Sequence, residues 1–565
     1  MSIWRKLGKK LIEVPDQDPR STARNRLALP FMIGTGAFLM IGIQLVSLSL
    51  EDSRPRQRFA DTTTSIERGK IYDRTGRILA TTLPAFELYA DPRTIMNPYE
   101  ATVQLSDLLP NLTEEQIFSQ LTRNTRYAEL SWRVSPATYA KALERGIVGV
   151  YGRERATRFY PQKYEAAHLI GTVNKDNKGL TGIESGMNDA LAKGEDVHLS
   201  IDIAVQAILR EEIETQISKF QAIGGAGLVM DVKTGEIIAL TSLPQYNANY
   251  YSRADKDAQF NRATKGVYEM GSTFKILNTA MALESGVFTA DDMVDVVSPL
   301  RVAGRTINDY HPEKQPLNVA EVMVVSSNKG SARIADALGA DVQQKYLSSL
   351  GLLNRLKLEI PEVATPIIPA PWQRVSTMTV SYGHGISVTL AHLAAAVSTT
   401  IGDGTRVHPS LIKGGVKKDY EERVFSHETV RQIRAIMRRV VTHKRGTGKF
   451  ANIEGYVVGG KTGTSEKIVD GRYDKKLNIT SFLAAFPAHD PKYVVVAMVD
   501  EPKGQKFSQY YATGGWVAAP AVGGFIRRAA PLLNVAPVDE DSPKIRPFLE
   551  VNSPQLDAEV QNASY

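Results

Sequence analysis

The longest uninterrupted apolar segment of the chain lies between Arg26 and Glu51, where no charged residue occurs. As a helix it would be about 36 Å long, enough to span a hydrocarbon core of about 30 Å. A cleaved signal peptide would have a shorter apolar core followed by a small-x-small site, whereas this segment continues into EDSRPRQRF. We therefore predict an uncleaved transmembrane anchor at residues 27–50, with cleavage as the alternative.

Basic residues flank this segment on both sides, and more of them precede it than follow it. Lys and Arg are retained on the cytoplasmic side of membrane spans. The bias predicts a cytoplasmic segment at residues 1–26. Nearly all of the remaining chain then lies outside the membrane, as in a single-pass protein.

Strict alternation of apolar and polar residues begins after the anchor. In SIERGKIYDRTGRILATT it continues on both sides of Asp73-Arg74-Thr75-Gly76, which predicts a β-hairpin with an Asp/Gly turn. Residues 100–150 have a mainly helical and polar pattern. There Thr113 is followed three residues later by Gln116, the spacing of a helix capping box.

The second half of the chain changes its periodicity twice. A stripe of Val205, Leu209, Ile213, Ile217 and Phe220 predicts a helix after LSID. Two strand-like runs follow, GLVMDV and EIIALTS, and then helical segments fill much of residues 272–445. Strand-like runs return in YVVGGKTGT, SFLAAFPA and YVVVAMVDEP. This order predicts an α+β fold, with an antiparallel sheet whose strands come from both ends of the region and are covered by helices.

The length of 565 residues is too great for one ordinary core. We predict an elongated N-terminal module at residues 51–195 and a second domain at residues 196–530. From Pro531 the chain is rich in proline and acidic residues, which predicts a disordered tail at residues 531–565.

Composition excludes several kinds of function. The chain has no cysteine, and its nine histidines form no HExxH pair, so we expect no metal site and no cofactor. The net charge of +7 comes without a basic run interleaved with aromatic residues, which argues against nucleic acid as a partner. A mildly basic surface instead suits anionic lipid or another polyanionic surface.

Candidate chemistry begins at YEMGSTFKILNTAMAL, where Ser272 and Lys275 precede a helix that is apolar nearly all round. The Ser-x-x-Lys spacing alone is weak evidence, because Ser326 with Lys329 and Ser410 with Lys413 match it equally well. Gly271 and the buried helix distinguish Ser272 and Lys275 from these two matches, which we interpret as structural. Residues three apart share a helix face, so both side chains can point the same way.

A serine hydroxyl becomes a good nucleophile only when a base removes its proton. Lysine has an ordinary pKa near 10.4, and it becomes such a base when burial or a neighbouring cation lowers that pKa. The apolar helix provides burial for Lys275. A second cation must come from elsewhere in the chain.

Two downstream motifs fit that requirement. Ser326-Ser327-Asn328 offers a hydroxyl and a carboxamide two residues apart. GGKTGT offers Lys461 as the second cation, with Thr462, Gly463 and Thr464 on a predicted edge strand beside which a substrate backbone can lie. An earlier Lys-Thr-Gly, at residues 233–235, is followed by Glu236, which would repel a substrate carboxylate, so we interpret it as structural.

With these motifs in this order, the sequence closely resembles the class B penicillin-binding proteins, the membrane-anchored D,D-transpeptidases of bacterial cell-wall synthesis. The resemblance extends from the anchor to about residue 530. It includes RGKIYDRTGRILA and HLIGTVNKDNKGLTGIE in the N-terminal module, and YEMGSTFK, SSN, SYGHGISVTLAHLAAAVSTT and GGKTGT in the second domain. HLIG, GLTGIE and GSTFK resemble the septal, division-specific (FtsI-type) members more than the elongation-specific ones. The family usually has proline where this chain has Met270.

The resemblance implies a penicillin-recognising serine transpeptidase domain behind a dimerisation or pedestal module. It implies that Ser272 attacks the penultimate D-alanine of a stem pentapeptide and forms an acyl-enzyme. Lys275 would be the general base, Ser326 would pass the proton to the leaving amine, and Asn328 would bind the substrate's side amide.

The same resemblance assigns the strand residues. Lys461 would tune Ser326 and Lys275 electrostatically, while Thr462, Gly463 and Thr464 would bind the substrate, the two threonines holding its terminal carboxylate or that of a β-lactam. The backbone amides of Ser272 and Thr464 would form the oxyanion hole, at about 3 kcal/mol per donor.

The expected partners are peptidoglycan stem peptides, β-lactams and the inner membrane. A membrane-embedded glycan polymerase of the FtsW type and other division proteins are also implied, since the N-terminal module has no sign of a glycosyltransferase domain. The expected location is the bacterial inner membrane at the division septum, with the catalytic domain in the periplasm.

Several alternatives remain open. The elongation-specific role is one. A D,D-carboxypeptidase or serine β-lactamase, which admits water after the same first step, is another. A non-catalytic scaffold or β-lactam sensor would keep the fold without turnover.

Overall fold

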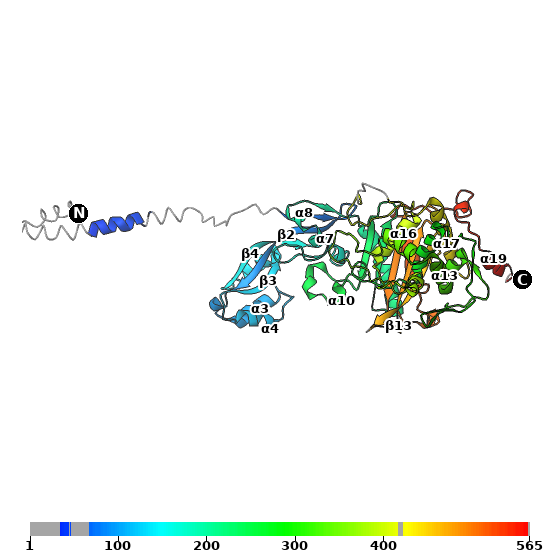
Figure 1. The fold of residues 1–565 in the computed structure, drawn as a ribbon. Helices are drawn as coiled ribbons and strands as arrows, with labels where there is room; N and C mark the ends of the chain where they lie inside the picture. Colours follow the sequence, from blue (N-terminus) through cyan, green and yellow to red (C-terminus); the bar gives the residue numbers. More distant parts are fainter. Residues whose placement is uncertain (1–33, 45, 47–66, 416–421, 470, 563–565) are drawn as a thin grey trace, which may run out of the picture. The chain divides into compact units, whose positions relative to one another are not determined.

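A computed structural model of the chain describes residues 34–44, 46, 67–415, 422–469 and 471–562 (Figure 1). Residues 1–66 and residues 67–565 form two separate units. In the first unit, residues 34–44 are helical. No helix within the described ranges combines the length and apolar character needed to cross a bilayer. The cytoplasmic segment at residues 1–26 and both ends of the anchor lie outside the described residues, so the anchor at residues 27–50 stays a prediction.

The second unit begins with the predicted hairpin. Strands β1 (Ile71–Tyr72) and β2 (Ile78–Ala90) pair antiparallel, with Ile71 opposite Ala80. Asp73 Oδ1 accepts hydrogen bonds from the backbone N–H of Thr75 at 2.8 Å and of Arg77 at 2.9 Å, which closes the turn. The sheet is completed by β3 (Ala128–Val134), β4 (Val150–Phe159) and β5 (Val197–His198), with β5 parallel to β1.

Short capped helices cover this module: α3 (Pro98–Ser106), α4 (Glu114–Leu121) and α5 (Pro136–Glu144). The predicted capping box is confirmed at the start of α4. Thr113 Oγ1 accepts from the backbone N–H of Gln116 at 3.3 Å, and the Gln116 side chain accepts from the backbone N–H of Thr113 at 3.0 Å. Three more helices, α6 (Ala167–Ile170), α7 (Gly182–Gly186) and α8 (Asn188–Ala192), lead to β5.

A buried ion cluster joins the two ends of this module. Glu184 is fully buried, and its carboxylate receives Arg68 Nε at 2.7 Å and Arg158 Nε at 2.6 Å. Each carboxylate oxygen therefore has its own guanidinium partner, which offsets the cost of burying these charges. Arg68 in the RGKIYDRTGRILA motif is thus a structural residue.

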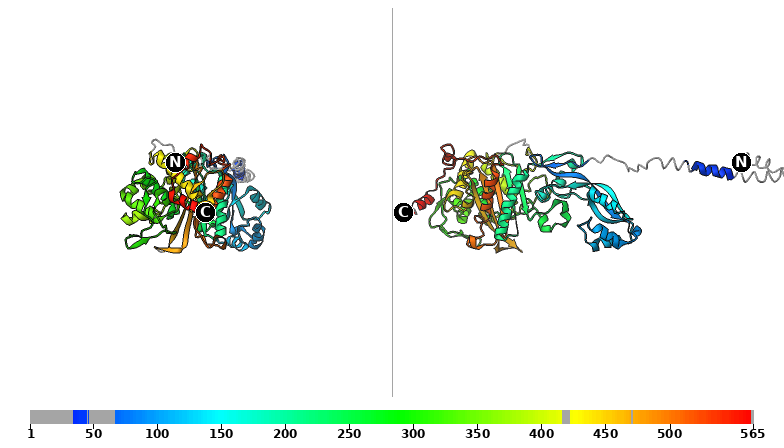
Figure 2. Two further views of the ribbon diagram at one scale, coloured as in Figure 1. Left: turned by 90° about the vertical axis from the view of Figure 1, so that its right-hand side faces the viewer. Right: turned by 180° about the vertical axis from the view of Figure 1, so that it is seen from behind.

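The C-terminal part of this unit, which we call the C-terminal domain, is built on an antiparallel sheet in the order β12-β13-β14-β6-β7. Strands β6 (Gly224–Asp231) and β7 (Ile237–Leu243) come from its start, and β12 (Gly459–Val469), β13 (Arg472–Phe486) and β14 (Tyr493–Asp500) come from its end. This confirms the predicted α+β architecture and the sheet assembled from both ends. Strand β12 is an edge strand, and Figure 2 shows the β12–β13 hairpin, in orange, projecting from the domain.

The two faces of this sheet carry different helices because side chains alternate along each strand. On β14, Val495, Ala497 and Val499 belong to the apolar cluster that includes α9 (Ile203–Phe220) and α18 (Ala518–Ala529). Residues of intervening positions, including Val494 and Val496, belong to the larger cluster on the other face.

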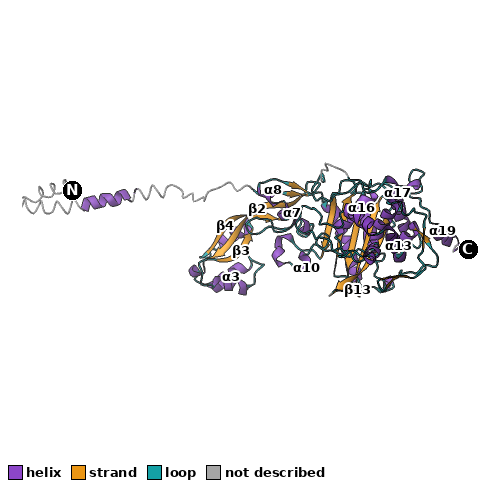
Figure 3. Cartoon of the chain, in the orientation of Figure 1, coloured by secondary structure: helices purple, strands orange, loops and turns teal. Residues whose placement is uncertain are grey.

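That larger cluster contains the helical block between the two groups of strands, shown in purple in Figure 3. Its helices are α10 (Lys256–Gln259), α11 (Phe274–Glu284), α12 (Val319–Val324), α13 (Asn328–Leu338), α14 (Ala340–Ser349), α15 (Arg374–Val380), α16 (Leu390–Ile401) and α17 (His427–Thr442). Small strand pairs connect them: β8 (Met293–Val294) with β11 (Leu317–Asn318), and β9 (Leu300–Val302) with β10 (Arg305–Ile307).

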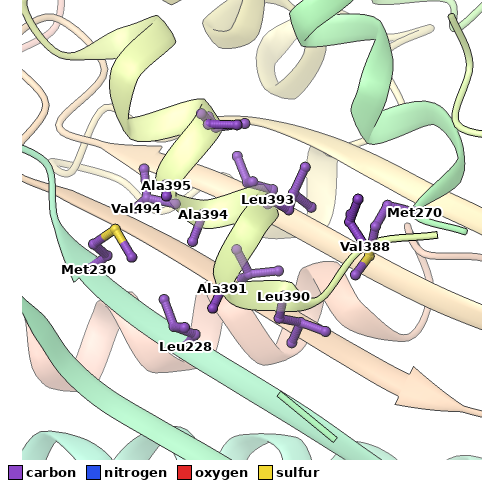
Figure 4. Packing of buried hydrophobic residues seen from close by; sticks show 14 of the residues in the cluster. Leu228, Met230, Met270, Val388, Leu390, Ala391, Leu393, Ala394, Ala395 and Val494 are labelled. Atoms are coloured by element: carbon purple, nitrogen blue, oxygen red, sulfur yellow. The ribbon is translucent and has the colours of Figure 1, made fainter. Parts of the chain in front are cut away.

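Helix α16 is buried along its whole length and lies on the sheet. Figure 4 shows its leucines and alanines beside Leu228, Met230 and Val494 of the strands. Met270 lies beside Val388 at the end of the same cluster and is 1% exposed. Met270 therefore anchors the segment before Ser272 in the core, where no catalytic chemistry takes place.

The tail is ordered where it is described, so the prediction of disorder for residues 531–565 is wrong for residues 531–562. Helix α19 (Pro554–Asn562) places Leu556 in the core with no exposed surface. Backbone N–H groups of Gln555 and Leu556 donate to Glu321 Oε1 at 2.7 and 3.0 Å. Composition misled the prediction because the few apolar residues of the tail find buried sites on the domain.

Acidic residues of the tail also have partners. Glu540 pairs with Arg438, and Asp557 pairs with Arg439, both on α17. The acidic residues that led us to predict an unfolded tail thus form ion pairs with basic residues elsewhere in the chain. Composition alone does not show this pairing.

Candidate active site

Ser272 lies in the 3-10 turn η3 (Gly271–Thr273), directly before α11. The backbone of Gly271 has φ +55°, and a Cβ there would lie 2.7 Å from the carbonyl oxygen of Thr464. Only glycine therefore allows the turn and strand β12 to approach this closely. The result is a serine at a helix start, where backbone N–H groups without intrahelical partners are available.

Lys275 brings the predicted residues together. Its Nζ lies 2.8 Å from Ser272 Oγ, 3.1 Å from Ser326 Oγ and 2.7 Å from Asn328 Oδ1. It also donates to the carbonyl oxygen of Ser326 at 2.8 Å. Two motifs that are far apart in the sequence thus converge on one amine.

Lys461 completes the cluster from β12, with Nζ 2.9 Å from Ser326 Oγ. The Lys461 side chain is fully buried, and burial lowers its pKa to about 7. Burial, and secondly the charge of Lys461, hold the pKa of Lys275 well below its ordinary value. A lowered pKa favours the neutral amine, and a neutral Lys275 can accept the serine proton, which is the property that the sequence required of it.

The loop between α12 and α13 holds Ser326 in a strained conformation, with φ +66°. A left-handed backbone at a residue with a side chain costs on the order of 1–3 kcal/mol and persists only where neighbouring contacts enforce it. Asp309 supplies those contacts: its carboxylate accepts from Ser327 Oγ at 2.8 Å, from the backbone N–H of Lys329 at 3.0 Å and from that of Asn328. The loop is therefore tied down at the point where Ser326 and Asn328 face Lys275.

The remaining predicted residues lie along β12. Thr464 is exposed, and its Oγ1 accepts from the backbone N–H of Gly514 at 3.1 Å. Thr462 is nearly buried, and its hydroxyl donates to Thr447 Oγ1 at 2.7 Å. A Cβ on Gly463 would lie 2.4 Å from Ser481 Oγ and 2.5 Å from the carbonyl oxygen of Met270. The absence of a side chain at Gly463 therefore allows β12 to pack closely against Ser481 and the backbone of Met270.

These contacts form a continuous path for protons. It runs from Ser272 Oγ through Lys275 Nζ and Ser326 Oγ to Lys461 Nζ, in steps of 2.8, 3.1 and 2.9 Å. Such a chain can remove a proton from a serine and return it to a leaving group. The arrangement suits acyl transfer through a covalent serine intermediate.

Comparisons with known proteins agree with this chemistry. Residues 225–523 match the penicillin-binding protein transpeptidase domain, and residues 63–199 match the penicillin-binding protein dimerisation domain. A probable peptidoglycan D,D-transpeptidase FtsI from Caulobacter vibrioides is 36% identical over 557 residues, which cover 94% of each chain. The chain belongs to the penicillin-binding protein transpeptidase family.

Further members of the family are similar over nearly the same length. The peptidoglycan D,D-transpeptidase FtsI of Escherichia coli is 30% identical and covers 90% of this chain and 91% of its own. Stage V sporulation protein D of Bacillus subtilis is 32% identical, with 91% and 87% covered. The fold resembles a crystal structure of penicillin-binding protein 3 from Mycobacterium tuberculosis in complex with aztreonam, with TM-score 0.67, 22% identity, and 84% and 98% covered.

The competing motif matches are structural in this family member. Lys329 donates to the carbonyl oxygen of Val297 at 3.1 Å, and Lys413 donates to that of Arg74 at 3.0 Å. Glu236, after the earlier Lys-Thr-Gly, pairs with Arg74 at 3.4 Å. Our interpretation of the earlier Lys-Thr-Gly as structural agrees with this contact.

Sequence reasoning missed three contributors to the site. Asp309 lies in TINDYHPE and Thr447 in KRGTGKF, and neither stretch has a recognisable pattern. Gly383 lies in the quoted SYGHG motif, and a Cβ there would lie 2.2 Å from the carbonyl oxygen of Gly271. The motif was visible in the sequence, but its contact with the nucleophile turn was not.

Proposed function

We propose that this protein is a peptidoglycan D,D-transpeptidase that cross-links stem peptides through an acyl-enzyme on Ser272. One observation carries the proposal: Lys275 Nζ lies within 3.1 Å of Ser272 Oγ, Ser326 Oγ and Asn328 Oδ1. The names of the relatives, which are peptidoglycan D,D-transpeptidases, support the substrate class.

In the acylation step, neutral Lys275 takes the proton of Ser272, and Oγ bonds to the carbonyl carbon of the penultimate D-alanine. The backbone N–H groups of Ser272 and Thr464 stabilise the oxyanion. Ser326 then delivers a proton to the leaving amine, the C–N bond breaks, and the terminal D-alanine departs. Asn328 holds the donor's side amide, and Thr462 and Thr464 hold its carboxylate.

In the second step, an amine from a neighbouring stem peptide attacks the ester carbon. The C–N bond forms, the C–Oγ bond breaks, and the proton that the amine loses reaches Oγ through Lys275. Water in place of the amine gives hydrolysis, which is the carboxypeptidase alternative.

We further propose that the protein acts at the division septum from an anchor at residues 27–50 in the inner membrane, with residues 51–195 and 196–530 as its two periplasmic domains. The FtsI names of two relatives support the division role. In this role a membrane-embedded glycan polymerase of the FtsW type would supply the strands that the protein cross-links.

Labelling with a fluorescent penicillin tests the chemistry. We expect a covalent adduct on the peptide that contains Ser272 and none in Ser272→Ala. An adduct on another residue, or labelling of Ser272→Ala, would contradict the assignment.

Depletion in the native cell tests the division role separately. We expect the tagged protein at mid-cell and filamentous cells after depletion. Rounded cells would instead indicate the elongation role.

A further inference from the structure

A second cluster of ionisable side chains adjoins the nucleophile turn and has no part in the proton path described above. Glu269, three residues before Ser272, is 6% exposed. Its Oε1 accepts from Tyr473 Oη and from the backbone N–H of Gly385, both at 2.8 Å. Its Oε2 lies 2.9 Å from His384 Nδ1, at a charge-pair distance rather than in an aligned hydrogen bond. A buried carboxylate thus orients an imidazole next to the segment that leads to Ser272.

The cluster is held by segments that also build the site. Ser465, next to Thr464 on β12, donates from Oγ to the carbonyl oxygen of Glu269 at 2.5 Å. Gly383 abuts Gly271, as shown above, and His384 follows it directly. Tyr473 belongs to the β12–β13 hairpin that projects in Figure 2. Three chain segments therefore bring one histidine to the edge of the nucleophile turn.

The imidazole is accessible on its other side. The His384 side chain is 33% exposed, and no hydrogen bond to Nε2 occurs among the described residues. Its ring stacks on Tyr473, with centroids 5.5 Å apart, and meets Tyr382 edge-on at 5.5 Å. Nδ1 thus faces the carboxylate, and Nε2 is left to exchange a proton with an incoming molecule, as in a general base oriented by an acid.

In the second half-reaction, the acceptor ammonium group must lose an extra proton, and the two lysines do not provide a base for it. An acceptor amine is mostly protonated at neutral pH, since unperturbed amines have pKa values of about 8–10. An ammonium group has no lone pair and cannot attack an ester. Lys275 takes one proton from the attacking amine and passes it to Oγ, so removal of the extra proton of the ammonium group requires another base.

We propose that His384, oriented by Glu269 and Tyr473, deprotonates the acceptor ammonium in the transfer step. The proposal rests on the transpeptidase function proposed above. His384 Nε2 takes one proton from the ammonium, and the freed lone pair forms the C–N bond to the acyl carbon. The C–Oγ bond breaks with its electron pair on Oγ, and the second proton of the amine reaches Oγ through Lys275. The imidazolium then releases its proton to solvent.

Each segment that packs against His384 contributes a charged or titratable side chain. Glu269 comes from the segment before η3, Tyr382 from the loop of His384 itself, and Tyr473 from β13. Glu466 of β12 acts on Tyr473. These neighbours are carboxylates and phenols, an environment that accommodates a positive charge on the imidazole during transfer.

The test separates acylation from transfer in the purified full chain. A peptide thioester serves as the donor and a D-amino acid as the acceptor, and the products of aminolysis and hydrolysis are both quantified. For His384→Gln we expect labelling by penicillin and hydrolysis of the donor within twofold of the parent. We expect the ratio of aminolysis to hydrolysis to fall at least tenfold at pH 7 and to recover near pH 9.5, where the free amine is abundant.

Two further variants complete the test. Glu269→Gln removes the orienting charge, and we expect a smaller fall in the same ratio. His427→Gln replaces an exposed histidine at the start of α17 and leaves the ratio unchanged. An unchanged ratio in His384→Gln, or a parallel loss of acylation, would overturn this inference. Absence of the Ser272 adduct in the parent protein would instead overturn the proposed function.

Discussion

Two lysines of the site differ from ordinary lysines because both are almost completely buried, with Lys275 1% exposed and Lys461 fully enclosed. Burial removes the hydration that stabilises an ammonium group, so the neutral amine becomes favoured. The same residues on the surface, such as Lys413 in a matching motif, keep ordinary structural roles. Burial therefore distinguishes Lys275 from the exposed Lys413.

Replacement of the proposed base gives the most direct prediction. In Lys275→Met, we expect acylation by labelled penicillin to slow by about 10²–10⁴-fold, the usual contribution of a general base. Stopped-flow or time-resolved labelling measures the rate. Lys413→Met is the matched control, since Lys413 belongs to the Ser410 match and only donates to a backbone carbonyl. Equal loss in both variants would contradict the assignment.

A pH profile tests the coupling between the two lysines. Lys275 must be neutral to act, so the acylation rate rises as pH increases through its lowered pKa. The charge of Lys461 helps to lower that pKa, so Lys461→Met raises it and moves the rising limb to higher pH. The rate constant for acylation, measured from pH 5 to 10, gives the position of the limb. If the rising limb of Lys461→Met lies at the same pH as in the parent protein, the charge of Lys461 does not lower the pKa of Lys275.

Strand β12 and turn η3 depend on close backbone contact. At Gly271, a side chain would meet the Thr464 carbonyl at 2.7 Å in addition to the cost of φ +55°. A left-handed conformation alone costs about 1–2 kcal/mol for a residue with a side chain. The additional contact would push the edge strand away from the nucleophile.

A pair of alanine variants separates these two effects. Gly304 has φ +72° and no atom within 4 Å of the position of a Cβ. We expect Gly304→Ala to lower stability only slightly and to leave acylation unchanged, whereas Gly271→Ala lowers acylation at least tenfold. Thermal unfolding and penicillin labelling provide the two readouts. Similar acylation in both variants would exclude a role for the close contact.

Helix α19 and the preceding tail contribute to the stability of the C-terminal domain. Leu556 is fully buried, whereas Leu532 in the same tail is 51% exposed. Removal of a buried leucine side chain costs about 2–5 kcal/mol.

We therefore expect Leu556→Ala to lower the free energy of unfolding by about 2–5 kcal/mol where the tail unfolds with the domain. Leu532→Ala, the matched control, changes it by less. Chemical denaturation of the purified chain measures both. An effect of Leu556→Ala no larger than that of Leu532→Ala would show that the tail is not part of the cooperative unit.

Local sequence patterns predict several of the helices, strands and turns of this protein. The alternation in SIERGKIYDRTGRILATT, the stripe from Val205 to Phe220 and the Thr113 capping box each depend on residues near one another in sequence, and the structure contains all three elements. The pattern around Ser272 also predicts candidate site residues, because a buried helix that begins with serine and lysine is an unusual combination.

Only the tertiary structure decided which distant groups meet. Asp309 stabilises the strained Ser326 loop, Glu269 pairs with His384, and Leu556 enters the core. Such contacts join residues that share no period and no motif, so no local pattern records them. The lowered pKa of Lys275 has the same origin, because it depends on how completely the folded chain excludes water from one amine.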